Sequence, residues 1–141
     1  MNEVLTQKII SLQRCVARAR EAHAQAGSRF QADQNLQDAA VLNVIRACDT
    51  AIDLANMVIR AQRLGIPAAT RESFLILGRE ELIDPTLAQQ LAKMVGFRNL
   101  AVHQYQELDL DLVESVIRLG LDDLLTFAEA VRGMAPGGRP S

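Results

Sequence analysis

Aromatic residues are scarce in this chain: tryptophan is absent, and there are one tyrosine and four phenylalanines. The core must therefore be built mainly from leucine, isoleucine, valine and alanine, a composition that suits helices. The two cysteines, Cys15 and Cys48, show neither CxxC nor Cys/His ligand spacing. We expect both to pack as small apolar core residues, and we expect the chain to bind no metal or other cofactor.

Long hydrophobic runs and excess positive charge are also lacking. No apolar run approaches the roughly 18 residues needed to cross a bilayer. The first residues do not resemble a signal peptide, because polar residues interrupt Val4-Leu5 through Ile9-Ile10. We therefore expect a soluble, cytoplasmic protein without a membrane partner. The formal net charge of −2 excludes a globally basic surface, so any RNA binding would need a local patch.

Apolar residues recur at three- and four-residue steps along most of the chain, which predicts helices. We expect a first helix over residues 3–26. A long second helix is expected over about residues 33–64, where Gly65 permits a left-handed end and Pro67 cannot continue the hydrogen-bond ladder. No alternating strand pattern, internal repeat or glycine-rich phosphate loop is visible.

Three start signals follow in the second half of the chain. Thr70 is a plausible N-cap for a short helix. Asp84, followed by Pro85, predicts a helix that leads toward Arg98. Asp109 can cap the last helix, which continues with a helical apolar period to Val131.

The predicted helices are joined by short connections within a chain of 141 residues. This pattern favours an all-α antiparallel bundle of four or five helices. We expect one domain over residues 1–132 and a disordered tail over residues 133–141, which is rich in proline and glycine.

Most of the usable chemistry lies in one segment, Arg98-Asn99-Leu100-Ala101-Val102-His103-Gln104-Tyr105. Arginine is a permanent, fork-shaped cation that matches phosphate geometry, and histidine exchanges a proton near neutral pH. Arg98 and His103 together indicate chemistry on a phosphodiester.

The spacing of this segment limits how its side chains can meet. On a straight helix Arg98 and His103 would point about 140° apart, whereas Tyr105 would return to within about 20° of Arg98. Either the helix ends or distorts between Arg98 and His103, leaving His103 at its C-terminus, or the two residues meet across a symmetric dimer. A purely structural role is the alternative, with Arg98 solvated or ion-paired, His103 capping a helix and Tyr105 packing its ring.

The segment resembles the HepT family, which is similar to the wider HEPN group of helical domains. The HEPN mark is an arginine, a polar residue, a few further residues and a histidine, and Tyr105 completes the narrower Arg-x4-His-x-Tyr form. Gln104 departs from the family, where an acidic residue is commoner. The resemblance spans the first to the last helix and includes Ala51-Ile52-Asp53-Leu54-Ala55, Gly65-Ile66-Pro67, Ser73-Phe74 with Leu77, and Met94 to Asn99.

The resemblance implies an HEPN-like two-fold homodimer and a metal-independent endoribonuclease that leaves a 2′,3′-cyclic phosphate and a 5′-hydroxyl. In that reading Arg98 neutralises charge on the phosphate, and His103 takes or relays the proton of the ribose 2′-hydroxyl. Asn99 would bind the phosphate or hold His103 in its working tautomer; the alternative is a surface amide without a role in the site. Asp53 is a possible partner for Arg98.

The resemblance also implies a toxin of a type VII toxin–antitoxin system. Its partner would be an MntA-like nucleotidyltransferase antitoxin that transfers AMP to Tyr105, the single tyrosine of the chain. The added charge and bulk would lie beside Arg98 and block RNA. Which RNA is cleaved, transfer or messenger, is not specified by the sequence.

A second function remains open at this point: a non-catalytic helical module that binds a nucleotide or docks onto a nucleotidyltransferase. A proton-exchanging His103 favours the ribonuclease, because a binding module has little need for it. Asp49 and Asp53, one helical turn apart, could be acid–base or metal carboxylates, but no histidine joins them in a Glu-x-x-His arrangement. For His23, near the end of the first helix, we expect a capping or solvated role.

Overall fold

The computed structural model describes residues 3–134. In chain order its elements are α1 (Glu3–Ala26), the 3₁₀ segment η1 (Gly27–Ala32), α2 (Gln34–Gln62), α3 (Glu72–Arg79), α4 (Pro85–His103), the 3₁₀ turn η2 (Tyr105–Glu107), α5 (Leu110–Ser115), the π turn η3 (Val116–Gly120) and α6 (Leu121–Gly133). No strand occurs in this part of the chain, so the predicted all-α class is confirmed. No helix of residues 3–134 has the length and hydropathy of a membrane span.

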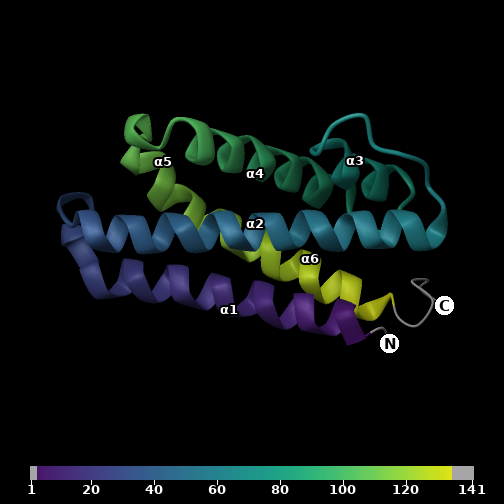
Figure 1. Ribbon diagram of the computed structural model, residues 1–141, viewed down its shortest axis with the longest axis horizontal. Coiled ribbons are helices and arrows are strands. Elements are labelled where there is room, and N and C mark those ends of the chain that lie inside the picture. Colours follow the sequence, from purple (N-terminus) through teal and green to yellow (C-terminus); the bar gives the residue numbers. More distant parts are fainter. Residues whose placement is uncertain (1–2, 135–141) are drawn as a thin grey trace.

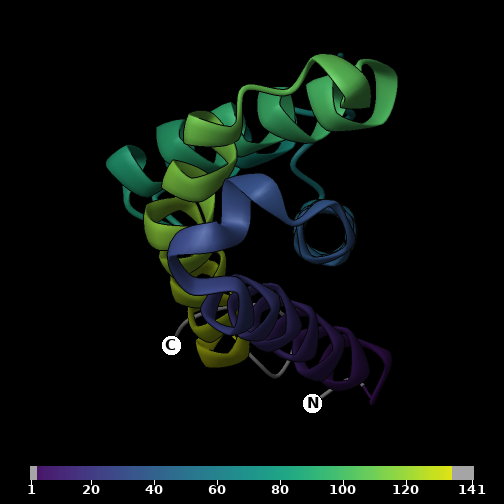
Figure 2. The same cartoon turned by 90° about the vertical axis from the view of Figure 1, so that its left-hand side faces the viewer.

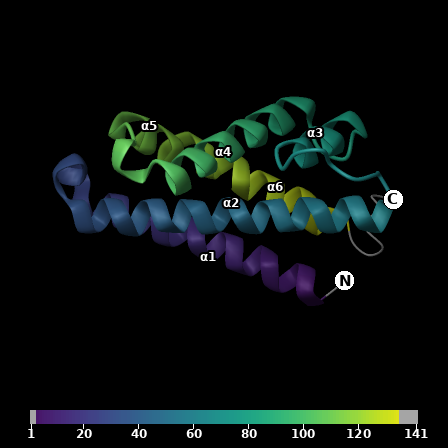
Figure 3. The same cartoon turned by 45° about the horizontal axis from the view of Figure 1, so that its top comes forward.

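The long helix α2 organises the bundle. It packs antiparallel against α1 along one side, and α4 runs along its other side (Figure 1). The end-on view shows α6 closing the space bounded by α1, α2 and α4 (Figure 2). The short helix α3 packs against α4 in the same layer (Figure 3). The segment around Arg98 therefore lies on a helix that faces α2.

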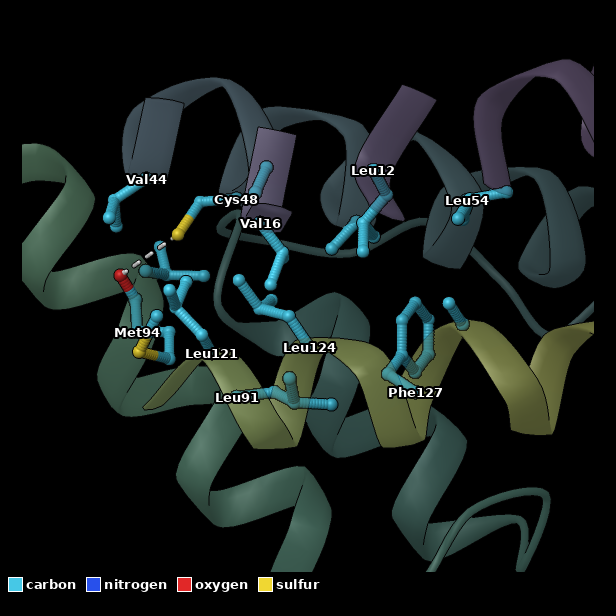
Figure 4. Packing of buried hydrophobic residues seen from close by; sticks show 14 of the residues in the cluster. Leu12, Val16, Val44, Cys48, Leu54, Leu91, Met94, Leu121, Leu124 and Phe127 are labelled. Carbon is cyan, nitrogen blue, oxygen red and sulfur yellow. Dashed lines mark hydrogen bonds between the residues drawn. The ribbon is translucent and has the colours of Figure 1, made fainter. Parts of the chain in front are cut away.

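The core contains aliphatic side chains from α1, α2, α4 and α6 (Figure 4). The fully buried side chains in this view include the aromatic Phe127 and the aliphatic Leu12, Val16, Leu54, Leu91, Leu121 and Leu124. Phe127 also meets Phe74 of α3 edge to face, with ring centroids 5.2 Å apart. Cys48 is buried as expected, and its Sγ lies 4.0 Å from the carbonyl oxygen of Met94. Burial raises the pKa of the Cys48 thiol to about 12, so this thiol stays protonated.

Two of the three predicted start signals are confirmed. The Asp84 carboxylate accepts from the backbone N–H of Thr86 at 2.7 Å, and Pro85 is the first residue of α4. Asp109 accepts from the backbone N–H of Asp111 at 2.9 Å at the start of α5. The Thr70 cap was wrong: α3 begins at Glu72 and has no side-chain cap.

The two predicted helix ends also differ in detail. α2 ends at Gln62 rather than residue 64, because Arg63 adopts the left-handed conformation (φ 56°). The backbone N–H of Leu64 then donates to the carbonyl of Ile59 at 3.0 Å, which satisfies a carbonyl of the last turn. At the other end of the chain, α6 includes Gly133, and Met134 is buried. The rest of the predicted tail, residues 135–141, lies outside the described residues.

The last helix is continuous from α5 to α6 but contains one π turn, Val116–Gly120. A Cβ at Gly120 would lie 2.6 Å from the Sδ atom of Met94 in α4. The absence of a side chain at this position lets the π turn approach α4 closely. Within residues 3–134 the bundle thus has five helices when α5, η3 and α6 are taken as one, which lies within the predicted four or five.

Gly78 and Gly96 provide a matched test of this packing. A Cβ at Gly78 in α3 would lie 2.6 Å from the Cβ of Ala88 in α4, whereas a Cβ at Gly96 meets nothing within 4 Å. We expect Gly78→Ala to lower the free energy of unfolding by about 1–3 kcal/mol through overpacking. Gly96→Ala should raise it by up to about 1 kcal/mol through helix propensity. Thermal and denaturant unfolding of both variants checks this; a Gly78→Ala variant as stable as the parent would contradict the close contact.

Candidate functional site

Arg98 extends from α4 onto α2. Its Nε donates a hydrogen bond to Asp49 Oδ1 at 2.7 Å, and the two side chains are 29% and 46% exposed. The pair is thus accessible to solvent at the surface between the two helices. Because an arginine carries five N–H donors, the guanidinium keeps donors that no described residue engages. The ion pair orients the cation while leaving it able to bind an anion.

Asn99 contacts Arg98 and not His103. Its Oδ1 accepts a hydrogen bond from Arg98 Nη1 at 3.1 Å. This contact is consistent with a supporting role at the cation. The structure does not show Asn99 holding the His103 ring within the chain.

The expectation that Asp53 is the partner of Arg98 was wrong. Asp53 pairs with Lys8 of α1, with Nζ 3.2 Å from Oδ2, and Asp49, one turn earlier on α2, takes the place expected of Asp53. The physical reason is helix phase: position 53 is rotated by about 40° from position 49 and faces α1 rather than α4.

His103 is the last residue of α4 and is exposed. No described residue forms a hydrogen bond or ion pair with its ring. The helix stays regular to this point, since the backbone N–H of Gln104 donates to the carbonyl of Leu100 at 2.8 Å. His103 therefore lies at a helix C-terminus as one predicted arrangement required, but the helix does not end or distort between Arg98 and His103. Within one chain the two side chains leave α4 about 140° apart.

Tyr105 begins η2, which is separated from α4 by Gln104, and is half-buried. Its hydroxyl donates a hydrogen bond to Asp38 of α2. The pKa of Tyr105 is raised to about 12, first by burial and then by the hydrogen bond to Asp38. Both groups line a cavity of about 580 Å³ whose other lining residues are Gln34, Gln37, Val41, Gln106, Leu108 and Leu110.

Asp38 and Asp49 share one face of α2. They are eleven residues apart, which corresponds to about 16 Å along the helix and a rotation of about 20°. One carboxylate holds the Tyr105 hydroxyl and the other holds Arg98. Tyr105 and Arg98 therefore contact the same face of α2, but they do not lie side by side as expected. About three turns of α2 separate their partners, Asp38 and Asp49.

Asp38 was not recognised in the sequence. The available signal was the spacing of acidic residues along α2, which places Asp38 and Asp49 on the face that α4 and η2 cover. His23 was also misjudged: its Nε2 lies 2.7 Å from Glu114 Oε1, and its ring meets Phe30 edge to face at 4.9 Å. It therefore joins α1 to η1 and α5 instead of capping a helix.

The site combines an oriented cation, an exposed imidazole and a hydrogen-bonded phenol. These groups can bind a phosphate, move a proton and accept a modification, respectively. Within residues 3–134 no group of three or more His, Cys, Asp or Glu side chains is arranged to hold a metal ion.

Comparison with known proteins relates the chain as a whole to one family. A family model described as "Ribonuclease HepT-like" matches residues 12–131. The chain is 42% identical over 132 residues to the mRNA nuclease HepT of Shewanella oneidensis, covering 94% of this chain and 98% of the relative. It is 30% identical over 81 residues to the tRNA nuclease HepT of Aphanizomenon flos-aquae, which covers 57% of this chain and 55% of that protein.

A solved structure shows the same fold. It contains a tri-AMPylated HEPN toxin from Shewanella oneidensis in complex with MNT antitoxin. The present chain superposes on the matching chain of that structure with a TM-score of 0.88 and 41% sequence identity. The match covers 94% of the present chain and 99% of the matching chain.

Proposed function

Because the chain belongs to the HepT-like ribonuclease family, we propose that it is the ribonuclease toxin of a toxin–antitoxin pair and that Arg98 and His103 carry out the cleavage. The surroundings of the two side chains support this assignment. Asp49 orients Arg98, whose guanidinium keeps N–H donors that no described residue engages, and His103 is exposed without a partner among the described residues. A phosphate-binding cation and a proton-transfer group need these environments. Family membership favours catalysis over the docking module.

The cleavage uses the ribose itself as the nucleophile. The 2′-hydroxyl attacks the adjacent phosphorus while His103 accepts its proton, and the bond from phosphorus to the 5′-oxygen breaks. The 5′-oxygen takes a proton from water, and His103 afterwards returns its proton to solvent. Arg98 stabilises the negative charge that grows on the phosphoryl oxygens. The products are a 2′,3′-cyclic phosphate and a 5′-hydroxyl, and no step requires a metal.

The site is completed by a second copy of the chain. Within one protomer Arg98 and His103 diverge on a regular helix, so they cannot face one phosphate. A two-fold homodimer in which the α4 segments line one cleft brings Arg98 of one protomer to His103 of its partner. Two arginines in one cleft also raise the local positive potential, although the chain has a net charge of −2.

The toxin is silenced by an MntA-like nucleotidyltransferase antitoxin that transfers AMP to Tyr105. The solved complex of an AMPylated HEPN toxin with MNT antitoxin supports this pairing. The added phosphodiester and adenine lie on the side of η2 that faces α2, the side that Arg98 also faces. Negative charge and bulk there repel and block RNA entering the cleft.

The substrate is cellular RNA, and the protein acts in the cytoplasm, where that RNA lies. The two relatives are named for messenger and transfer RNA, respectively. Sequencing of the cleaved ends from total RNA assigns the class for this chain.

Asp49 and Asp53 provide a matched test of the cation. Asp49→Asn should lower the rate of RNA cleavage by about tenfold or more, because the guanidinium loses the carboxylate that orients it. Asp53→Asn, the same change one turn along α2, should leave the rate within about twofold, because the exposed Asp53 contributes only a salt bridge to Lys8 at the protein surface. Single-turnover cleavage assays compare the two, and equal effects would contradict the role of Asp49.

The assignment is tested by incubating purified protein with total RNA and a chelator, with and without coexpressed antitoxin and ATP. We expect cleavage that leaves 2′,3′-cyclic phosphate and 5′-hydroxyl ends, and its loss when the antitoxin is coexpressed. Chelator-sensitive cleavage, or 5′-phosphate ends, would refute the mechanism.

A further inference from the structure

On the basis of the proposed modification of Tyr105, we propose that Asp38 is the base that accepts the phenolic proton during AMP transfer. The toxin would then supply a catalytic group for its own silencing, in addition to the acceptor hydroxyl. The Tyr105 hydroxyl donates a hydrogen bond to the Asp38 carboxylate, so this carboxylate is in direct contact with the proton that must leave.

The contact between Tyr105 and Asp38 joins two elements of the fold. Asp38 lies in the first part of α2, and Tyr105 lies in η2, 67 residues later in the chain. Gln34, one turn before Asp38, donates its side-chain amide to Asp38 Oδ1 at 2.8 Å and so fixes the carboxylate. Of the described residues that line the adjoining cavity, Asp38 alone carries a carboxylate, and none carries a positive charge.

Transfer of AMP to Tyr105 requires that a base remove the proton of the phenolic hydroxyl. The attacking species must be a phenolate or a phenol that loses its proton as the new bond forms. Burial and the bond to Asp38 raise the pKa of Tyr105 to about 12. At pH 7 a phenol with that pKa is ionised only to about one part in 10⁵. A free phenolate is therefore too rare to carry the reaction, and an ionised aspartate in contact with the proton removes this barrier.

A nucleoside triphosphate that donates AMP is the one reagent that the transfer needs. The Tyr105 oxygen bonds to the α-phosphorus, the bond from that phosphorus to the bridging oxygen breaks, and pyrophosphate leaves. The phenolic proton passes to the Asp38 carboxylate and from there to water. The adjoining cavity of about 580 Å³ gives the incoming group room on the Tyr105 side.

The test follows AMP transfer to purified toxin from ATP labelled at the α-phosphate, with magnesium and an MntA-type antitoxin. Asp38→Asn keeps an oxygen that can accept the hydrogen bond but cannot take the proton. Asp53→Asn is the matched control, because Asp53 is an exposed aspartate of the same helix that pairs with Lys8. Circular dichroism confirms that each variant is folded, and Tyr105→Phe reports whether Tyr105 is the acceptor.

We expect Asp38→Asn to slow labelling at pH 7 by about 10²- to 10⁴-fold, the usual contribution of a general base. The deficit should shrink as pH rises, because the phenolate fraction of the variant grows tenfold per pH unit. Labelling of Asp38→Asn within about threefold of wild type, or a deficit that stays constant with pH, would overturn the role of Asp38. Labelling of Tyr105→Phe at the wild-type rate would instead refute the proposed modification site.

Discussion

Replacing His103 with alanine is expected to lower the rate of RNA cleavage by about 10²- to 10⁴-fold, the range that a positioned acid–base group contributes. The side chain is exposed at the end of α4 and has no hydrogen-bond or ion-pair partner among the described residues, so the fold should tolerate the change. The loss of a histidine at a helix C-terminus costs under about 1 kcal/mol of stability. Cleavage rates, helicity and oligomeric state are measured on the same preparation.

The chain offers a natural control, because it contains two histidines. His23 bonds to Glu114 and packs against Phe30, far from α4 in the sequence. His23→Ala should lower the free energy of unfolding by about 1–3 kcal/mol, since Glu114 keeps only Gln31 as a hydrogen-bond partner among the described residues and the ring contact with Phe30 is lost. It should leave cleavage intact. Full activity in His103→Ala, or equal loss in both variants, would refute the assignment of His103 as the proton-transfer group.

Replacing Tyr105 with phenylalanine should make the toxin insensitive to its antitoxin. Tyr105 is the single tyrosine of the chain, and its hydroxyl is the proposed acceptor of AMP. With antitoxin and ATP present, the variant should cleave RNA within about twofold of its antitoxin-free rate, whereas wild type should lose most of its activity. The lost hydrogen bond to Asp38 should cost only about 0.5–1.5 kcal/mol of stability.

Two further measurements decide how the Tyr105→Phe result is interpreted. Co-elution of the variant with the antitoxin shows that the complex still forms, so that resistance reflects lost modification. Mass spectrometry of the variant shows whether AMP is attached elsewhere. A Tyr105→Phe protein that is still modified and silenced would place the modification at another residue.

The regular parts of this fold could be predicted from the sequence, because local chemistry decides them. The apolar period and the carboxylate caps of Asp84 and Asp109 are short-range signals, and both capped helices start where these residues indicated. The end of α2 lies two residues before the expected end near residue 64, because Arg63 (φ 56°) already adopts the left-handed conformation two residues before Gly65 (φ 105°). The π turn Val116–Gly120 packs closely against Met94 of α4, and no local pattern in the sequence encodes this contact between elements.

The residues of the site also fall into a group that the sequence could identify and a group that it could not. Arg98, His103 and Tyr105 could be selected because their side-chain chemistry is concentrated in one segment. Their partners could not, because Asp38 and Asp49 are separated from them by 67 and 49 residues in the chain. Choosing Asp49 over Asp53 requires the rotation of α2 relative to α4, which only tertiary packing fixes. The regular course of α4 as far as His103 shows that one chain does not bring Arg98 and His103 to the same side of this helix.

In the proposed dimer each working site takes Arg98 from one protomer and His103 from its partner, and a mixed dimer can reveal this arrangement. Arg98→Ala and His103→Ala proteins, each inactive alone, are coexpressed with different tags so that the heterodimer can be isolated. If the sites form across the two-fold axis, each heterodimer retains one intact pair and should recover about half of the wild-type rate of RNA cleavage. A purified heterodimer no more active than its two parents would contradict the account.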